Sequence, residues 1–182
     1  GLKDNSLSSV AWLASLPFYA GRIPMQIVSR FDNLGIEWPA VCDKFCSYHR
    51  HPINVAFHLA CTPLMLFGWL GACDSLLYPG ISYALTSAYL VILAFILPPF
   101  DLIKSALTMG VIVLACRYLR LGVAGLFFAG LNEVVTGATH SIWEPAYITS
   151  YNKQPVADFF QNLSVHYLLL LPLGQAAAAR IY

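Results

Sequence analysis

The stretch from Ile53 to Ala72 contains no Asp, Glu, Lys or Arg, and most of its residues are apolar. A helix needs about 20 such residues to cross the hydrocarbon core of a bilayer. Lipid offers no hydrogen-bond partners to the backbone, so a run of this kind is stable there as a helix. The composition agrees, because 58% of the chain is hydrophobic and 10% is charged. Ordinary soluble domains have about 45–50% apolar and about 25% charged residues.

Four further apolar segments follow, separated by turn residues and polar loops, at about residues 81–97, 102–118, 123–143 and 159–173. The sequence therefore predicts an all-α protein, a polytopic membrane helical bundle of four to five spans. Residues 1–47 are interrupted by Pro and Gly too often for a long helix. We expect them to form an N-terminal arm, interfacial or partner-binding, ahead of a membrane domain over residues 48–182.

Charge and cysteine usage exclude some classes of protein. The net charge of +1 offers no basic surface for a nucleic acid, so we expect no nucleic-acid partner. Five cysteines are an odd number and favour free thiols over a disulfide framework. A zinc site at Cys42, Cys46 and His49 is a weaker alternative, because no further Cys or His pair completes it. The start at Gly1 rather than Met suggests processing, which would place the chain in an organelle inner membrane.

Three of the five histidines, His49, His51 and His58, lie within ten residues at the start of the first predicted span. Polar groups are costly at the mouth of an apolar helix unless something binds them. Asn54 and His58 are four residues apart and share a helix face. His49 reaches the same point only if the chain bends before Pro52, which a proline favours. We expect His51 to be an interface residue or a helix cap instead.

Counting spans places the start of span one, the end of span four and the start of span five on one side of the membrane. His140, Glu144 and His166 should then lie in the same half of the bilayer as His49 and His58. Neutral imidazoles with a carboxylate suit a divalent transition metal, and with open positions they suit non-haem Fe(II). The alternative is a set of hydrogen-bonded core histidines. We expect His166 to contact the metal ligands without binding the metal itself.

The fourth span carries a stripe of polar residues four apart, namely Asn132, Thr136, His140 and Glu144, with Glu133 beside it. For Asn132, Thr136 and Glu133 we favour a structural network that bonds across helices, with Glu133 paired to Arg117 or Arg120. A transporter or lipid-binding protein that uses Glu133 as a proton site is the weaker alternative.

The motif Tyr48-His49-x-x-Pro52-x-Asn54-x-x-x-His58, followed by Thr62-Pro63, resembles the first signature of the Mpo1-like family (DUF962). The segment His140-Ser141-Ile142-Trp143-Glu144 is similar to its second signature, a His followed four residues later by Glu. Asn152-Lys153-Gln154-Pro155 is similar to a segment that follows in many members. The resemblance covers about residues 45–175.

The resemblance implies a multi-pass integral membrane protein of the endoplasmic reticulum. It implies an Fe(II)-dependent dioxygenase that shortens 2-hydroxy fatty acids by one carbon in α-oxidation, with membrane lipids around it. His49, His58 and His140 would bind the metal. Glu144 and Asn54 would be catalytic residues, and Glu144 could itself be a ligand. Tyr48 would contact the metal ligands without binding the metal itself.

A second function remains open from the sequence. The long arm at residues 1–47, the processed-looking start and the low charge also suit a non-catalytic structural subunit of a large organellar membrane complex. Such a subunit would retain the Mpo1-like fold, and its arm would lie along neighbouring subunits. An isolated chain that binds iron would argue against this alternative.

Overall fold

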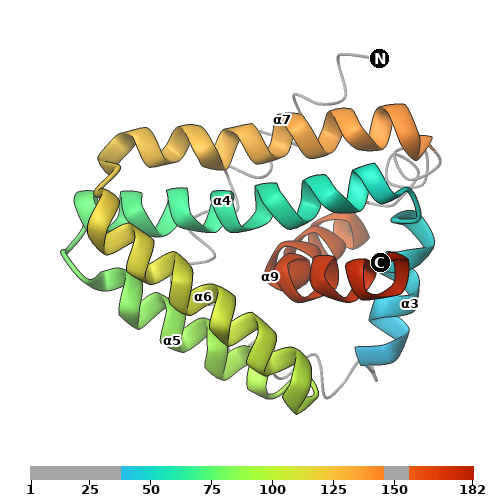
Figure 1. The fold of residues 1–182 in the computed structure, drawn as a ribbon, viewed down its shortest axis with the longest axis horizontal. Coiled ribbons are helices and arrows are strands. Elements are labelled where there is room, and N and C mark those ends of the chain that lie inside the picture. The colour runs from blue at the N-terminus through green and yellow to red at the C-terminus, as the bar shows by residue number, and fades with distance from the viewer. Residues whose placement is uncertain (1–37, 146–155) are drawn as a thin grey trace. The chain divides into compact units, whose positions relative to one another are not determined.

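Helices account for all the regular structure in the described part of the chain (Figure 1). The structure, a computed structural model, describes residues 38–145 and 156–182, without the side chains of Glu133 and of residues 156–168. The helices are α3 (Trp38–Tyr48), α4 (Pro52–Leu76), α5 (Ile81–Ala94), α6 (Pro99–Leu119), α7 (Gly125–Trp143) and α9 (Val156–Ile181), with a 3-10 turn at Gly122–Ala124. The all-α prediction is confirmed. The prediction for the arm falls mostly outside the described residues.

Two of the described helices, α4 and α6, are long and apolar enough to cross a membrane by length and composition. The expected number of four to five spans is not reached by this measure. Helix α5 has only 14 residues. Helix α7 has 19 residues, and Asn132, Thr136 and His140 interrupt its apolar character. Each predicted segment is nevertheless a helix, so the periodic apolar runs located the elements.

The helix boundaries follow from proline and from left-handed backbone positions. Pro52 occupies the first turn of α4, where its missing N–H costs no hydrogen bond. Gly80 precedes α5 with a φ of 89°, a conformation that is strained for residues with a side chain. The Asp74 carboxylate fixes this corner, because it accepts hydrogen bonds from the Ser82 N–H at 2.8 Å and the Ser82 hydroxyl at 2.7 Å.

Helices α4 and α7 lie side by side and antiparallel (Figure 1). Gly68 and Gly125 meet backbone to backbone: a Cβ on Gly68 would lie 2.2 Å from the Gly125 carbonyl oxygen. Small residues allow helices to approach this closely. At the other end of the pair, Asn54 on α4 faces His140 on α7, 3.3 Å from Nδ2 to Nδ1. The two contacts define the register that aligns the polar residues of both helices.

The apolar core lies among α4, α6 and α9, where buried side chains form one cluster: Leu70, Met109, Ile112, Val113, Cys116 and Leu171. The opposite face of α6 is exposed. Its large side chains recur every three or four residues, at Phe100, Ile103, Leu107, Val111, Leu114 and Tyr118. An apolar helix face without protein contacts in the described structure suits contact with lipid.

Residues Trp38–Tyr182 form one compact unit, which includes α3. The sequence placed the domain boundary between residues 47 and 48, ten residues later. Two long-range contacts attach α3 to this unit. The Trp38 indole N–H donates to Asp101 Oδ2 on α6 at 3.0 Å, and Asp43 Oδ1 lies 2.7 Å from Arg180 Nη2 on α9. These contacts fix α3 on the rest of the unit, and α3 ends at Tyr48, directly before His49.

Candidate metal centre

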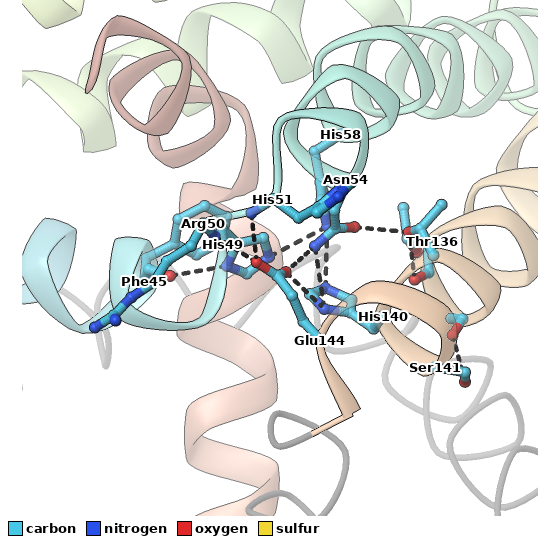
Figure 2. Close-up of polar contacts among 12 residues, drawn as sticks. Phe45, His49, Arg50, His51, Asn54, His58, Thr136, His140, Ser141 and Glu144 are labelled. Atoms are coloured by element: carbon cyan, nitrogen blue, oxygen red, sulfur yellow. Dashed lines mark hydrogen bonds and ion pairs between the residues drawn. The ribbon is translucent and has the colours of Figure 1, made fainter. Parts of the chain in front are cut away.

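Three histidines converge at the end of the α4–α7 pair, next to the break between α3 and α4 (Figure 2). His49 lies in the break, His58 on α4 and His140 on α7. Their ligand nitrogens all lie within 4.8 Å of one another. The side chains are buried, with exposed fractions of 2%, 3% and 4%. The predicted convergence of these three histidines is confirmed.

The bend predicted before Pro52 is what brings His49 to the cluster. Helix α3 ends at Tyr48, and α4 begins at Pro52 in a new direction. His51, in the N-cap position, has an extended backbone with φ of −80° and ψ of 123°, as a residue before proline prefers. On an unbroken helix, nine residues would turn His49 about half a revolution away from His58. The bend therefore brings His49 next to His58, which a continuous helix would not do.

Two of the three distances between the imidazole nitrogens fit a shared metal ion. His58 Nε2 lies 3.2 Å from His49 Nε2 and 3.1 Å from His140 Nε2. Two nitrogens that each bind one metal at about 2.1 Å are about 2.9–3.4 Å apart for bond angles of about 90–110°. A ring nitrogen carries either one proton or one lone pair, so His58 Nε2 cannot form two good hydrogen bonds to both neighbours. One metal ion would satisfy all three nitrogens.

The tautomer of His49 also suits a ligand. Its Nδ1 lies 2.8 Å from the carbonyl oxygen of Phe45, one helical turn earlier. A carbonyl oxygen only accepts, so Nδ1 carries the proton and Nε2 of the neutral ring presents its lone pair to the cluster. The Phe45 ring stacks on the same imidazole, with centroids 3.6 Å apart and planes 9° apart. These two contacts fix the orientation of the His49 ring.

Glu144 approaches the cluster from behind His140. One carboxylate oxygen accepts the backbone N–H groups of Arg50 and of His51, the latter at 2.9 Å. The other accepts the Asn54 amide N–H and lies 3.6 Å from His140 Nδ1 (Figure 2). The carboxylate therefore faces the Nδ1 side of His140 and not the Nε2 side where the imidazoles meet. Glu144 therefore lies next to His140 at ion-pair distance, with the Asn54 amide nitrogen closer to the same ring nitrogen at 3.3 Å, and its carboxylate is not in the position of a ligand.

Asn54 connects the remaining polar groups of the site. It is completely buried, with 0% exposure. Its amide N–H donates to Glu144, and its carbonyl oxygen accepts from the Thr139 hydroxyl at 2.7 Å. Because both ends of the amide are occupied, Asn54 joins α4 to α7 beside the histidines. The predicted catalytic roles of Asn54 and Glu144 stay predictions.

The other predicted site residues lie as follows. Tyr48 is the last residue of α3 and is half-buried next to His49. His51 occupies the predicted cap position, but its side chain makes no cap hydrogen bond and its ring stacks on Trp143 at 5.5 Å. The backbone of His166 belongs to α9, and its side chain lies outside the described residues, as does that of Glu133.

The polar stripe of α7 differs in part from the predicted network across helices. The Thr136 hydroxyl donates to the backbone oxygen of Asn132 at 2.7 Å, within its own helix. Thr139, outside the stripe, makes the contact across to Asn54. Three buried side-chain oxygens, Thr62 Oγ1, Thr86 Oγ1 and Asn132 Oδ1, have no hydrogen-bond partner in the described part of the chain. Within the stripe, Thr136 therefore bonds along α7, whereas His140 and Glu144 contact α4 and the residues just before it.

Sequence reasoning missed Phe45 and Thr139. Both carried a weak signal: Phe45 lies four residues before His49 on a helix, and Thr139 is adjacent to His140. The cysteines of α3 are free, as expected. Burial, and then the neighbouring Cys46, raise the pKa of Cys42 to about 12, so this thiol stays protonated at neutral pH in the metal-free protein.

Comparisons with protein-family models, with curated proteins and with solved structures found no match to this chain.

Proposed function

We propose that this chain is a membrane metalloprotein that binds Fe(II) at His49, His58 and His140 and acts as a dioxygenase on 2-hydroxy fatty acids, shortening them by one carbon. The observation that supports it most is the convergence of three buried imidazole nitrogens, two pairs of which are 3.1 and 3.2 Å apart. Imidazole ligands also suit Zn, Cu and Ni. The choice of iron and of the substrate follows from the resemblance to the Mpo1-like family.

The residues around the histidines suit a metal centre with defined ligand geometry. The Phe45 carbonyl and the Phe45 ring orient His49, and Glu144 stands behind the Nδ1 side of His140. The Phe45 carbonyl leaves Nε2 of His49 free to bind a metal. Three protein ligands leave further positions for substrate and O₂. When bound, Fe(II) would supply the electron transfer to O₂ that oxidation of a 2-hydroxy acid requires.

Burial of the site suits an apolar substrate. The histidines and Asn54 are almost inaccessible, and α6 presents an exposed apolar face beside the same bundle. A fatty acid could remain in the lipid while its polar head reaches the end of the α4–α7 pair. Exclusion of water around the head also strengthens polar interactions inside the site. The location in the endoplasmic reticulum is part of this proposal and rests on the resemblance alone.

Metal content and product formation test the proposal separately. The purified chain, loaded anaerobically with Fe(II) and freed of excess metal, should hold about one iron per chain. His58→Ala should abolish this binding, whereas His51→Ala should retain it, because His51 stacks on Trp143 and lies outside the cluster. If His58→Ala binds iron as the unaltered chain does, the metal site is refuted.

Activity is then measured with 2-hydroxyhexadecanoate and O₂ by mass spectrometry of the lipid products. The proposal expects a product one carbon shorter, which depends on iron and is absent in His58→Ala. Stoichiometric iron binding without a shortened product would overturn the substrate and reaction but would leave the metal centre in place. Purification only at fixed stoichiometry within a large complex, without iron, would instead favour the structural-subunit alternative.

A further inference from the structure

A pocket of about 350 Å³ opens between α3 and the end of α9, and its wall includes His49 but neither His58 nor His140. The residues that matter in its wall are Asp43, His49, Arg50, Ala177, Arg180 and Ile181. Ligand cavities commonly measure about 300–1,000 Å³, so this one has room for a polar head and a few carbons. A long acyl chain would have to continue outside it.

The charges in this wall favour an anion. The wall contains two arginines, Arg50 and Arg180, and one aspartate, Asp43. With His49 neutral, the net charge of the wall is one positive charge. Arg180 is held by Asp43 at 2.7 Å, in a pair whose side chains are 48% and 70% exposed. Exposed ion pairs contribute little to stability, so a bound anion can compete with Asp43 for Arg180.

Arg50 is available to the same anion. Among the described side chains, its guanidinium has no hydrogen-bond or ion-pair partner, and its backbone N–H donates to Glu144. Its backbone is thereby fixed while the side chain remains exposed. A guanidinium presents paired N–H donors that match the oxygens of a carboxylate or a phosphate.

The rest of the wall selects the kind of anion. Ala177 and Ile181 on α9 supply apolar surface beside the arginines. His49 is shared, because it lines the pocket and also directs Nε2 toward His58 at 3.2 Å. An anion with an alkyl chain would satisfy both kinds of surface, and its head would lie against a ligand of the metal centre.

We propose that this pocket binds the oxyanion head, carboxylate or phosphate, of a single-chain amphiphile through Arg50 and Arg180. The inference deepens the proposed function, on which the choice of a fatty acid as one of the probes rests. The charge and shape of the pocket carry the rest. A soluble oxyanion would use the arginines alone, whereas an amphiphile would also use Ala177 and Ile181.

The test is binding to the metal-free full chain in a non-ionic detergent, by calorimetric titration. The probes are 2-hydroxyhexadecanoate, hexadecyl phosphate, hexadecanol and inorganic phosphate. We expect both anionic amphiphiles to bind at least tenfold more tightly than hexadecanol and inorganic phosphate. Equal binding of hexadecanol would refute recognition of the head. Inorganic phosphate binding as tightly as hexadecyl phosphate would refute an amphiphile as the ligand.

Variants locate the binding in this pocket. Arg50→Gln and Arg180→Gln should each weaken both anionic amphiphiles at least tenfold, while Arg50→Lys should lose less. Lys104→Gln is the matched control, since Lys104 is a cation on α6 outside the pocket. Asp43→Asn should bind more tightly, because it releases Arg180 from its pair. Unchanged affinity in both arginine variants, or weaker binding in Asp43→Asn, would overturn the proposal.

These outcomes are distinct from failure of the metal centre. His58→Ala removes a metal ligand outside the pocket and should retain amphiphile binding. If amphiphiles bind and iron does not, the pocket stands without the proposed reaction. If iron binds and amphiphiles do not, the metal centre stands, and recognition of the substrate head by Arg50 and Arg180 is refuted.

Discussion

Replacing Gly68 with alanine should destabilise the protein, because α4 and α7 touch at this position through backbone atoms. The new Cβ would lie 2.2 Å from the Gly125 carbonyl oxygen and 3.1 Å from Phe128 Cβ. Real Cβ atoms essentially never approach closer than 3.0 Å, so the helices must separate by at least 3.0 − 2.2 = 0.8 Å. The obstacle is backbone, and it cannot turn aside as a flexible side chain could.

The size of the effect follows from two opposing terms. Insertion of a methyl group into a packed contact costs about 1–3 kcal/mol. Alanine gains up to about 1 kcal/mol over glycine in a helix interior. Gly130→Ala on α7 isolates this second term, because a Cβ there meets no atom within 4 Å. Both variants gain the helix term, so it cancels in the comparison, and we expect Gly68→Ala to be about 1–3 kcal/mol less stable than Gly130→Ala.

Thermal unfolding in detergent, followed by intrinsic fluorescence, measures the difference. About 1–3 kcal/mol corresponds to roughly 2–12 °C in Tm for a domain of this size. Gly130→Ala should melt at or slightly above the unaltered chain, and Gly68→Ala should melt below Gly130→Ala. Equal Tm values for the two variants would refute the reasoning, because they would mean that α4 and α7 do not meet through Gly68 and Gly125.

Two further substitutions test contacts that position the histidines. Glu144→Gln should lower stability by about 1–3 kcal/mol and weaken metal binding about tenfold or more, because an amide N–H₂ would face N–H groups that now donate to the carboxylate. Thermal unfolding and metal titration measure these two effects. A variant with unchanged stability and metal affinity would contradict the role of Glu144 as an acceptor. Trp38→Phe should cost about 1 kcal/mol through loss of the 3.0 Å hydrogen bond to Asp101, and a Tm equal to that of the unaltered chain would show that this bond does not anchor α3.

Much of the site could be predicted from the sequence, because it depends on features that are local along the chain. Pro52 indicates a helix start and a bend, and the four-residue spacing of Asn54 and His58 places them on one face. The run lengths then located the helix that carries His140. None of these steps needed atomic detail, because each follows from helix periodicity or from the restricted backbone of proline.

The register of α4 against α7 could not be predicted in the same way. Several glycines occur in both helices, and which of them meet depends on the packing of all side chains between them. The orientation of Glu144 depends on that register too, because the N–H groups that donate to its carboxylate belong to the α3–α4 break and to Asn54. Sequence reasoning therefore placed Glu144 near the cluster but left it undecided between a ligand and an acceptor.

The two ends of the α4–α7 pair can be connected by counting residues. From Gly125 to His140 is 140 − 125 = 15 residues, and from Gly68 back to Asn54 is 68 − 54 = 14 residues, so the two helices advance together. At about 1.5 Å per residue, the glycine contact lies about 22 Å from Asn54 and His140. A contact at each end restrains both sliding and splaying of the pair. The glycine contact thus stabilises, from a distance, the alignment in which His58 and His140 lie 3.1 Å apart.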